Sequence, residues 1–227
     1  MNESHLTLVL AAAAGLGASA YLGTVAMYGA GKFFRVRVCE LGFGVGPKLF
    51  GFQLGSAEVG FRLFPINSFV RFQDNRFPAS QGDPKTSMDS RPCWIRFLIP
   101  FLGCLVPLAI GGSLLGMTNA REAFFPLVEF IKGTLSPFGY AQELLRSYED
   151  FRRENGILRA AALPVFITGS LSLLPISPFA GLGQALVAIR KNDCQGHMPA
   201  WSGVSLFVFL AIVCAWIAAA AVFVFSK

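Results

Sequence analysis

No charged residue interrupts the stretch Leu6–Gly31, whose sequence is LTLVLAAAAGLGASAYLGTVAMYGAG. A helix needs about 20 apolar residues to cross the roughly 30 Å hydrocarbon core of a bilayer, so this stretch is long enough to span a membrane. The residues before it include Glu3 but no lysine or arginine, unlike the basic start of a signal peptide. We therefore interpret Leu6–Gly31 as a retained transmembrane helix.

The composition of the whole chain agrees with this interpretation. Hydrophobic residues make up 54% of the 227 residues and charged residues only 14%, and the mean hydropathy is +0.56. A soluble domain carries about 25% charged residues, because much of a small folded surface must be polar. Five cysteines in 227 residues is ordinary usage, and an odd number leaves at least one unpaired. Both facts argue against a secreted disulfide scaffold. The composition predicts an integral membrane protein and excludes a disordered or collagen-like chain.

Three more apolar stretches predict further transmembrane helices at about 97–117, 160–189 and 201–226. The third contains Pro164, Pro175 and Pro178, so we expect it to be broken, with its irregular backbone shielded by protein or by a water-filled cavity. The expected fold is an α-helical membrane protein with four transmembrane helices, the third broken by prolines, in a single membrane core over residues 1–227.

Between the first two spans, the pattern changes to that of a small β-sheet. Glu58–Phe64 and Phe69–Phe72 alternate apolar and polar residues with a period of two, which is typical of half-buried strands. We expect a membrane-associated β-hairpin region at 36–76, with a turn-rich stretch at 42–47, and then a linker at 77–92. After the second span, 120–158 is expected to form an amphipathic segment on the other side of the membrane.

The distribution of basic residues predicts the orientation. Residues 32–96 carry ten basic and five acidic side chains, whereas residues 118–159 carry six of each. The positive-inside rule then places 32–96 and the sheet in the cytoplasm and both termini outside. These basic residues are expected to contact anionic lipid headgroups. We expect no nucleic-acid binding, because no stacking platform or nucleic-acid-binding module accompanies the charge.

Two sets of small residues have a spacing of four, which is typical of helix packing faces within one subunit or between subunits. The first set is Gly15, Ser19 and Gly23, and the second is Gly112 and Gly116.

Three motifs point to one family of membrane proteins. They are GVGPKLF at Gly44–Phe50, RLFPINSFV at Arg62–Val70 and LSLLPISPFAG at Leu171–Gly181. They are similar to the GFGPKLF loop, the RLIPLGGYV strand and the LNLLPIPPLDG third-span motif of the site-2 protease family, the intramembrane zinc metalloproteases related to peptidase M50. The resemblance covers nearly the whole chain, and it implies an integral, multi-pass protein of a bacterial inner membrane.

The zinc ligands of that family have no counterpart here. The resemblance places its HExxH motif on residues 23–27 and its third-span aspartate on Ala180, so the degenerate positions are Gly23, Thr24, Met27 and Ala180. Neither 6–31 nor 160–189 contains any His, Asp, Glu or Cys, so no shift of the alignment supplies ligands. A catalytic zinc needs about three protein ligands and an open position. The sequence therefore predicts no catalytic residues, no metal and no cofactor.

The resemblance implies that a family pocket is kept as a binding surface. We expect a non-enzymatic binding, regulatory or assembly subunit that contacts other integral membrane proteins through the broken third span and the cytoplasmic sheet. The residues expected to bind the partner are Leu174, Pro175, Ile176, Ser177, Pro178 and Phe179. The alternative is an active intramembrane zinc metalloprotease whose ligands come from elsewhere. A small transporter or channel is disfavoured because the spans offer no charged lining.

Overall fold

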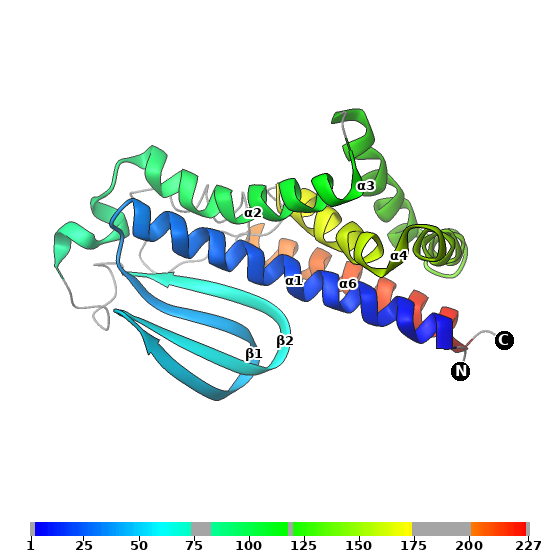
Figure 1. Ribbon diagram of the computed structural model, residues 1–227, viewed down its shortest axis with the longest axis horizontal. Coiled ribbons are helices and arrows are strands. Elements are labelled where there is room, and N and C mark those ends of the chain that lie inside the picture. Colours follow the sequence, from blue (N-terminus) through cyan, green and yellow to red (C-terminus); the bar gives the residue numbers. More distant parts are fainter. Residues whose placement is uncertain (1–2, 74–82, 118–119, 174–200, 226–227) are drawn as a thin grey trace. The chain divides into compact units, whose positions relative to one another are not determined.

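A computed structural model describes residues 3–73, 83–117, 120–173 and 201–225 (Figure 1). In chain order, the elements are α1 (Glu3–Phe33), β1 (Val38–Leu54), β2 (Ala57–Phe72), the short 3₁₀ helices η2 (Pro84–Thr86) and η3 (Met88–Ser90), α2 (Cys93–Leu115), α3 (Ala120–Leu135), α4 (Tyr140–Ser172) and α6 (Trp201–Phe225). The chain divides into two compact units. The first unit comprises Met1–Leu16, Pro107–Leu171 and Met198–Lys227, and the second comprises Gly17–Val106 and Ser172–His197.

The expected fold with four transmembrane helices is wrong. The described residues form five α-helices and a mixed sheet, and two of these helices are long and apolar enough to cross a membrane. They are His5–Phe33 and Cys93–Leu115. These two helices support the assignment of the chain as a membrane protein.

The difference arises because counting uncharged residues does not show where helices begin and end. α4 consists of two helices joined at non-helical backbone at Gly156 (φ 82°, ψ 171°), so most charged residues of 140–159 belong to the helix before the expected third span, and the helix that enters this span follows Gly156. Residues 174–189 of that span lie outside the described residues. The fourth expected span coincides with α6, which runs from Trp201 to Phe225, but α6 is not one of the two candidate spans identified among the described residues.

The first helix ends in a Schellman motif that turns the chain toward the sheet. The Val36 N–H donates to the Gly31 carbonyl at 2.8 Å, and the Arg35 N–H donates to the Lys32 carbonyl at 3.1 Å. Arg35 takes the left-handed conformation (φ 55°) that this motif usually assigns to glycine. The Arg91 guanidinium donates to the Arg35 carbonyl at 2.6 Å and so holds the turn.

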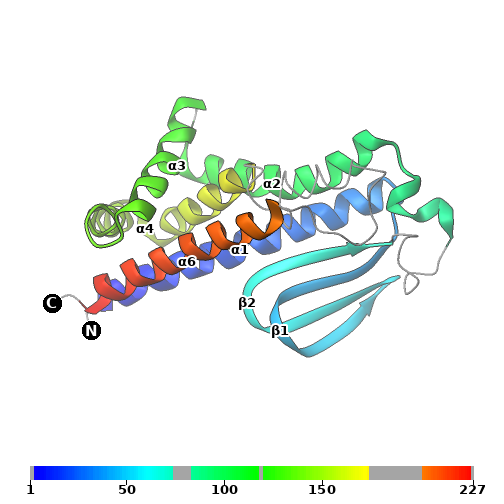
Figure 2. The same cartoon turned by 180° about the vertical axis from the view of Figure 1, so that it is seen from behind.

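The two strands bend so that four strand segments lie side by side against α1 (Figures 1 and 2). Leu41 in β1 pairs with both Val59 and Val70 of β2. The start of β1 therefore lies between the two halves of β2, parallel to one and antiparallel to the other, while the end of β1 pairs antiparallel with the start of β2. The sheet is thus mixed.

The glycine-rich stretch expected as a turn is part of β1. Gly44 (φ 101°) and Gly46 (φ 96°) have positive φ, and the register shifts around them. Glycine adopts positive φ without the steric cost of a Cβ, so these residues bend the strand without ending it.

One face of the sheet packs against α1. The buried cluster is formed by Val38, Leu41, Ala57, Val59 and Val70, and Met27 and Tyr28 of α1 pack against it. Apolar residues of β1 and β2 that alternate along the strands thus cover the side of the helix. The sheet is fixed to the half of α1 that belongs to the second unit.

The described part of the expected linker begins at Asp83 and is held by Gln73. Gln73 is fully buried, its amide Nε2 donates to the Asp83 carbonyl at 3.2 Å, and its Oε1 accepts from the Thr86 hydroxyl at 3.0 Å. The Gln73 carbonyl accepts from the Met88 N–H at 3.0 Å and from the Ser87 hydroxyl at 3.3 Å. A single buried glutamine therefore ties the end of β2 to η2 and η3.

In the first unit, α1, α2 and α4 approach closely where glycines face them. A methyl group on Gly111 would lie 2.8 Å from the Phe166 backbone nitrogen, and one on Gly169 would lie 2.8 Å from that of Leu108. A methyl group on Gly15 would clash with the Ala161 carbonyl oxygen. These glycines allow helix packing within the subunit.

The packing face expected at Gly112 and Gly116 is different in the structure. A methyl group on Gly112 would lie at ordinary contact distance from the Phe166 ring, whereas one on Gly116 would meet nothing within 4 Å. Gly116 has φ 73° and ends α2, since the Met117 N–H donates to the Gly112 carbonyl at 3.0 Å. Gly116 is therefore a helix C-cap.

Candidate functional site

The three degenerate positions that the structure describes, two of ligands and one of the catalytic base, lie on one part of α1, close to α2. Thr24 is 1% exposed and Gly23 is buried. A methyl group on Gly103 of α2 would lie 2.8 Å from Met27 Cγ, 3.1 Å from Met27 Sδ and 3.4 Å from the Gly23 carbonyl oxygen. The two helices are therefore in direct contact where the family would place a hydrated metal.

Thr24, which occupies the position of the family's catalytic base, connects α1 to the sheet. Its hydroxyl donates to Ser68 Oγ at 2.5 Å, and the Ser68 hydroxyl donates to the Ala20 carbonyl at 2.6 Å. A threonine hydroxyl does not titrate in the physiological range and does not act as a base there. This part of the site has a structural hydrogen-bond network.

The donor set at these positions does not fit zinc. Gly23 and Met27 carry no nitrogen or oxygen in their side chains, and thioether sulfur is not among the usual zinc ligands. Within the described ranges, no group of three His, Cys, Asp or Glu side chains is close enough to share a metal ion. Ala180, the fourth degenerate position, lies outside the described residues.

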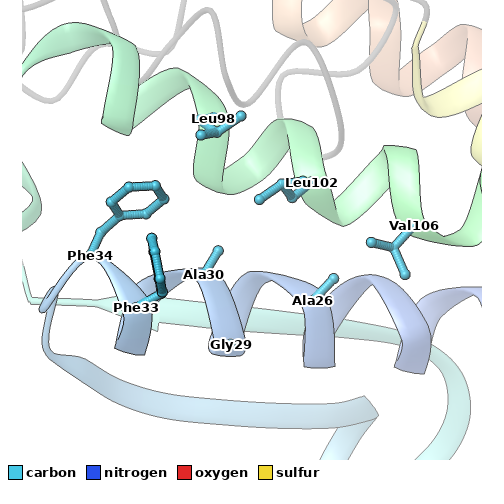
Figure 3. A pocket seen from close by; sticks show the side chains of 8 residues that line it. All are labelled: Ala26, Gly29, Ala30, Phe33, Phe34, Leu98, Leu102 and Val106. Carbon is cyan, nitrogen blue, oxygen red and sulfur yellow. The ribbon is translucent and has the colours of Figure 1, made fainter.

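An apolar groove runs beside this contact, between the second half of α1 and the first half of α2 (Figure 3). Its volume is about 390 Å³, and it is lined by Ala26, Gly29, Ala30, Phe33 and Phe34 of α1 and by Leu98, Leu102 and Val106 of α2. The α1 wall consists of small side chains near its middle, and a methyl group on Gly29 would meet nothing within 4 Å. The groove can therefore admit apolar side chains from another molecule.

Aromatic rings border one end of the groove. Phe34 lies edge-on between Phe33, at a centroid distance of 5.0 Å, and Trp94, at 5.5 Å. Phe33 and Trp94 are both largely exposed. Aromatic side chains often occupy the boundary between membrane and water. This end of the groove therefore matches the membrane boundary that is expected at the end of the first span.

Sequence reasoning did not find the groove, because its two walls come from helices far apart in the sequence. The residues predicted to bind a partner, Leu174–Phe179, lie outside the described residues, so their prediction stays open. The motif residues Gly44–Phe50 belong to β1 and Arg62–Val70 to β2. The small-residue spacing in α1 and the degenerate positions Gly23 and Met27 were the sequence patterns near the groove.

Sequence reasoning also missed a buried polar cluster in the first unit. Glu149 is buried, and its carboxylate contacts His5 Nε2 at 3.4 Å and Arg153 Nη2 at 2.6 Å. The His5 ring lies against Phe223 at 4.4 Å. The spacing of Glu149 and Arg153 predicts their helical pair, but no local pattern predicts the contact with His5.

A second missed contact bridges the irregular backbone of α4. The Tyr148 hydroxyl donates to the Ala160 carbonyl at 2.6 Å, which spans the kink at Gly156. Burial raises the pKa of Tyr148 well above its ordinary value, since the phenolate is poorly solvated there. The hydroxyl therefore remains a hydrogen-bond donor across the physiological pH range.

No family model matches the chain, and part of the chain is similar to a curated protein. Over 84 residues the chain is 34% identical to a curated protein of Thermotoga maritima with the name "Putative zinc metalloprotease". The aligned region covers 35% of this chain and 16% of the relative. This similarity points to a metalloprotease-like family.

Proposed function

We propose that this chain is a site-2-protease-like membrane protein that binds other integral membrane proteins without cleaving them. The observation that carries the proposal is the state of the degenerate positions in α1. Gly23 and Met27 contact α2 at Gly103, and Thr24 is hydrogen-bonded to the sheet. A hydrolytic zinc site needs ligands and an open coordination position, and this arrangement supplies neither.

The groove beside these positions is the described part of the proposed docking surface. Its proposed occupant is a transmembrane helix of another protein. Small residues such as Ala26, Gly29 and Ala30 let a neighbouring helix approach closely. Because the groove lies between the two helices that are long and apolar enough to cross a membrane, a helix in the bilayer can reach it.

The edge of the sheet offers a second contact for the same partner. The end of β1, from Lys48 to Leu54, pairs on one side with β2, and no other described strand pairs with it. Leu49, Phe50 and Phe52 on this segment are exposed. An extended segment that follows the partner's helix can add to this edge through backbone hydrogen bonds. The broken stretch Leu174–Phe179 remains a proposed third contact.

The charge distribution supports a location and an orientation for this site. We place residues 32–96, with their excess of basic side chains, on the cytoplasmic face of a bacterial inner membrane. Anionic headgroups then lie near these residues. A Lys85→Cys variant in a chain whose own five cysteines are replaced by serine tests this, because Lys85 is exposed in η2. It should react with a cytoplasmic maleimide reagent, and labelling only from the outside would overturn the orientation.

The absence of catalysis is tested by metal content and cleavage. Protein purified in mild detergent should hold no stoichiometric zinc and should not cleave a membrane-embedded peptide. About one zinc per chain, lost on chelation together with proteolysis, would instead support the alternative of an active metalloprotease with ligands from elsewhere.

The groove is tested by filling it. In Gly29→Leu, the new side chain enters open space, so the isolated protein should keep its melting temperature while co-purification of its membrane partners falls by about tenfold. The matched control is Val25→Leu, because Val25 is 59% exposed on the same helix and does not line the groove. Equal recovery of the partners with both variants would exclude the groove as their docking site.

A further inference from the structure

Helix α3 carries an exposed apolar stripe that no element of the described chain covers. Four large apolar side chains form it: Phe125 is 66% exposed, Val128 45%, Ile131 43% and Leu135 82%. Their spacing of three, three and four residues places them along one side of the helix. Such a stripe is costly in water, so its position on the molecule needs an explanation.

The opposite side of α3 is fixed to α6 in the same unit. The Phe130 ring stacks on Trp216 at 4.7 Å, with an angle of 5° between the rings, and Trp216 Nε1 donates to Thr134 Oγ1 at 2.9 Å. Gly133 provides space for this contact, since a methyl group there would lie 2.8 Å from Trp216 Cζ2. These contacts leave the stripe facing outward.

The position of α3 in the chain indicates what surrounds the stripe. Helix α2, one of the two candidate membrane spans, ends at Leu115, and its C-cap is Gly116. Helix α3 begins at Ala120. A link this short keeps the start of α3 within roughly 18 Å of the end of the span. If α2 crosses the bilayer, α3 starts at the boundary between hydrocarbon and water.

From these observations we infer that α3 is an interfacial helix whose stripe is buried in the headgroup and acyl boundary of the bilayer. A helix of this kind buries its apolar face about 5–10 Å below the surface, while its polar residues remain in the headgroup layer. The inference concerns a lipid surface and does not depend on the groove or on a protein partner.

One charged side chain, Lys132, lies on the same face as the stripe, four residues after Val128, and its pairing bears on the kind of lipid binding. Lys132 Nζ contacts Glu129 Oε1 at 2.9 Å and lies 5.8 Å from the Tyr140 ring centroid, and the Tyr140 hydroxyl donates to Glu129. The lysine charge is thus balanced by a carboxylate. The insertion of α3 therefore depends on apolar area and not on anionic lipid.

Photocrosslinking of the full chain in vesicles tests this assignment. The photoreactive residue p-benzoylphenylalanine replaces Phe125 or Leu135 in vesicles of phosphatidylcholine. We expect phospholipid adducts at both positions, in about tenfold higher yield than at Arg153, whose side chain is 60% exposed on a charged part of α4. Adducts to a second protein chain in place of lipid, or a lipid yield no higher than at Arg153, would overturn the inference.

Two further measurements separate lipid insertion from general exposure. In a protein with the reporter at Phe125, Leu135→Asp should reduce the lipid adduct several-fold, whereas Leu135→Met should not, and both should keep the wild-type melting temperature in detergent because Leu135 is 82% exposed. Addition of phosphatidylglycerol should leave the adduct yield unchanged. A yield that rises with the anionic fraction, or one unaffected by Leu135→Asp, would contradict the apolar basis of the inference.

Discussion

The Thr24 hydroxyl in α1 donates a hydrogen bond of 2.5 Å to Ser68 Oγ in β2, across 44 positions of sequence. Thr24 is 1% exposed, so this hydrogen bond forms away from water. We expect Thr24→Val, which keeps the shape of the side chain, to lower the free energy of unfolding by about 1 kcal/mol. Denaturation in mild detergent measures this change.

A threonine that bonds only to its own helix provides the control for this prediction. The Thr168 hydroxyl donates to the Pro164 carbonyl one turn earlier at 2.7 Å. Thr168→Val should change stability by less than about 0.5 kcal/mol. If Thr24→Val is equally mild, the contact between α1 and β2 does not depend on this hydroxyl.

The strained turn after α1 predicts a stabilising substitution. Arg35 has φ 55°. In this left-handed conformation a Cβ raises the conformational energy by about 1 kcal/mol, and glycine, which has no Cβ, avoids this strain. Because Arg91 contacts the backbone carbonyl of Arg35 and not its side chain, Arg35→Gly keeps that bond. We expect a gain of about 0.5–1 kcal/mol in the free energy of unfolding. Arg35→Ala, which removes the charge but keeps the Cβ, should give no gain.

Local sequence patterns predicted part of the fold. The alternation in Glu58–Phe64 and Phe69–Phe72 reflects a strand with one buried face, and β2 includes both stretches. The stretch 42–47 predicted a turn, but β1 continues through it, because glycines with positive φ can bend a strand as well as end it. The number of spans was wrong, since apolar composition does not fix helix boundaries.

The candidate site was less predictable, because its contacts join distant parts of the sequence. The resemblance placed the degenerate positions on Gly23, Thr24 and Met27, all of which lie in α1. It did not predict Ser68 or Gly103 as their neighbours, because those depend on how α1 packs against β2 and α2. No property of an isolated segment contains that information.

The buried amide of Gln73 predicts how the segment after β2 is held. Gln73→Leu removes the bonds to the Asp83 carbonyl and to Thr86 and leaves both groups without that partner. We expect a loss of about 2 kcal/mol in the free energy of unfolding and faster tryptic cleavage after Lys85. Gln53→Leu, at an exposed position of β1, should affect neither. Unchanged cleavage after Lys85 in Gln73→Leu would show that η2 is held by other contacts.

The pair formed by Lys48 and Glu58 predicts a pH dependence at the sheet edge. A hydrogen bond from Lys48, and then its positive charge, lowers the pKa of Glu58 below its ordinary value, against a small opposing effect of burial. Since the pKa is depressed in the folded state, the contribution of the pair to stability is complete above the ordinary glutamate pKa and is lost as the pH falls through the folded value. In Lys48→Gln, an NMR titration should find the pKa of Glu58 closer to its ordinary value. An unshifted pKa would show that Lys48 is not the cause.

The close approach of α2 and α4 predicts opposite effects for two adjacent glycines. In Gly111→Ala, the new methyl group would lie 2.8 Å from the backbone nitrogen of Phe166, which cannot move without moving α4. We expect this variant to lose about 1–3 kcal/mol in the free energy of unfolding. In Gly112→Ala, the methyl group meets only the Phe166 ring at 3.5 Å, and the higher helix propensity of alanine should give a gain of up to about 1 kcal/mol. Parallel unfolding experiments in the same detergent measure the difference. If both variants change the free energy of unfolding by the same small amount, α2 and α4 can move apart to accept the methyl group on Gly111. The close packing within the first unit would then have to rest on Gly15 and Gly169.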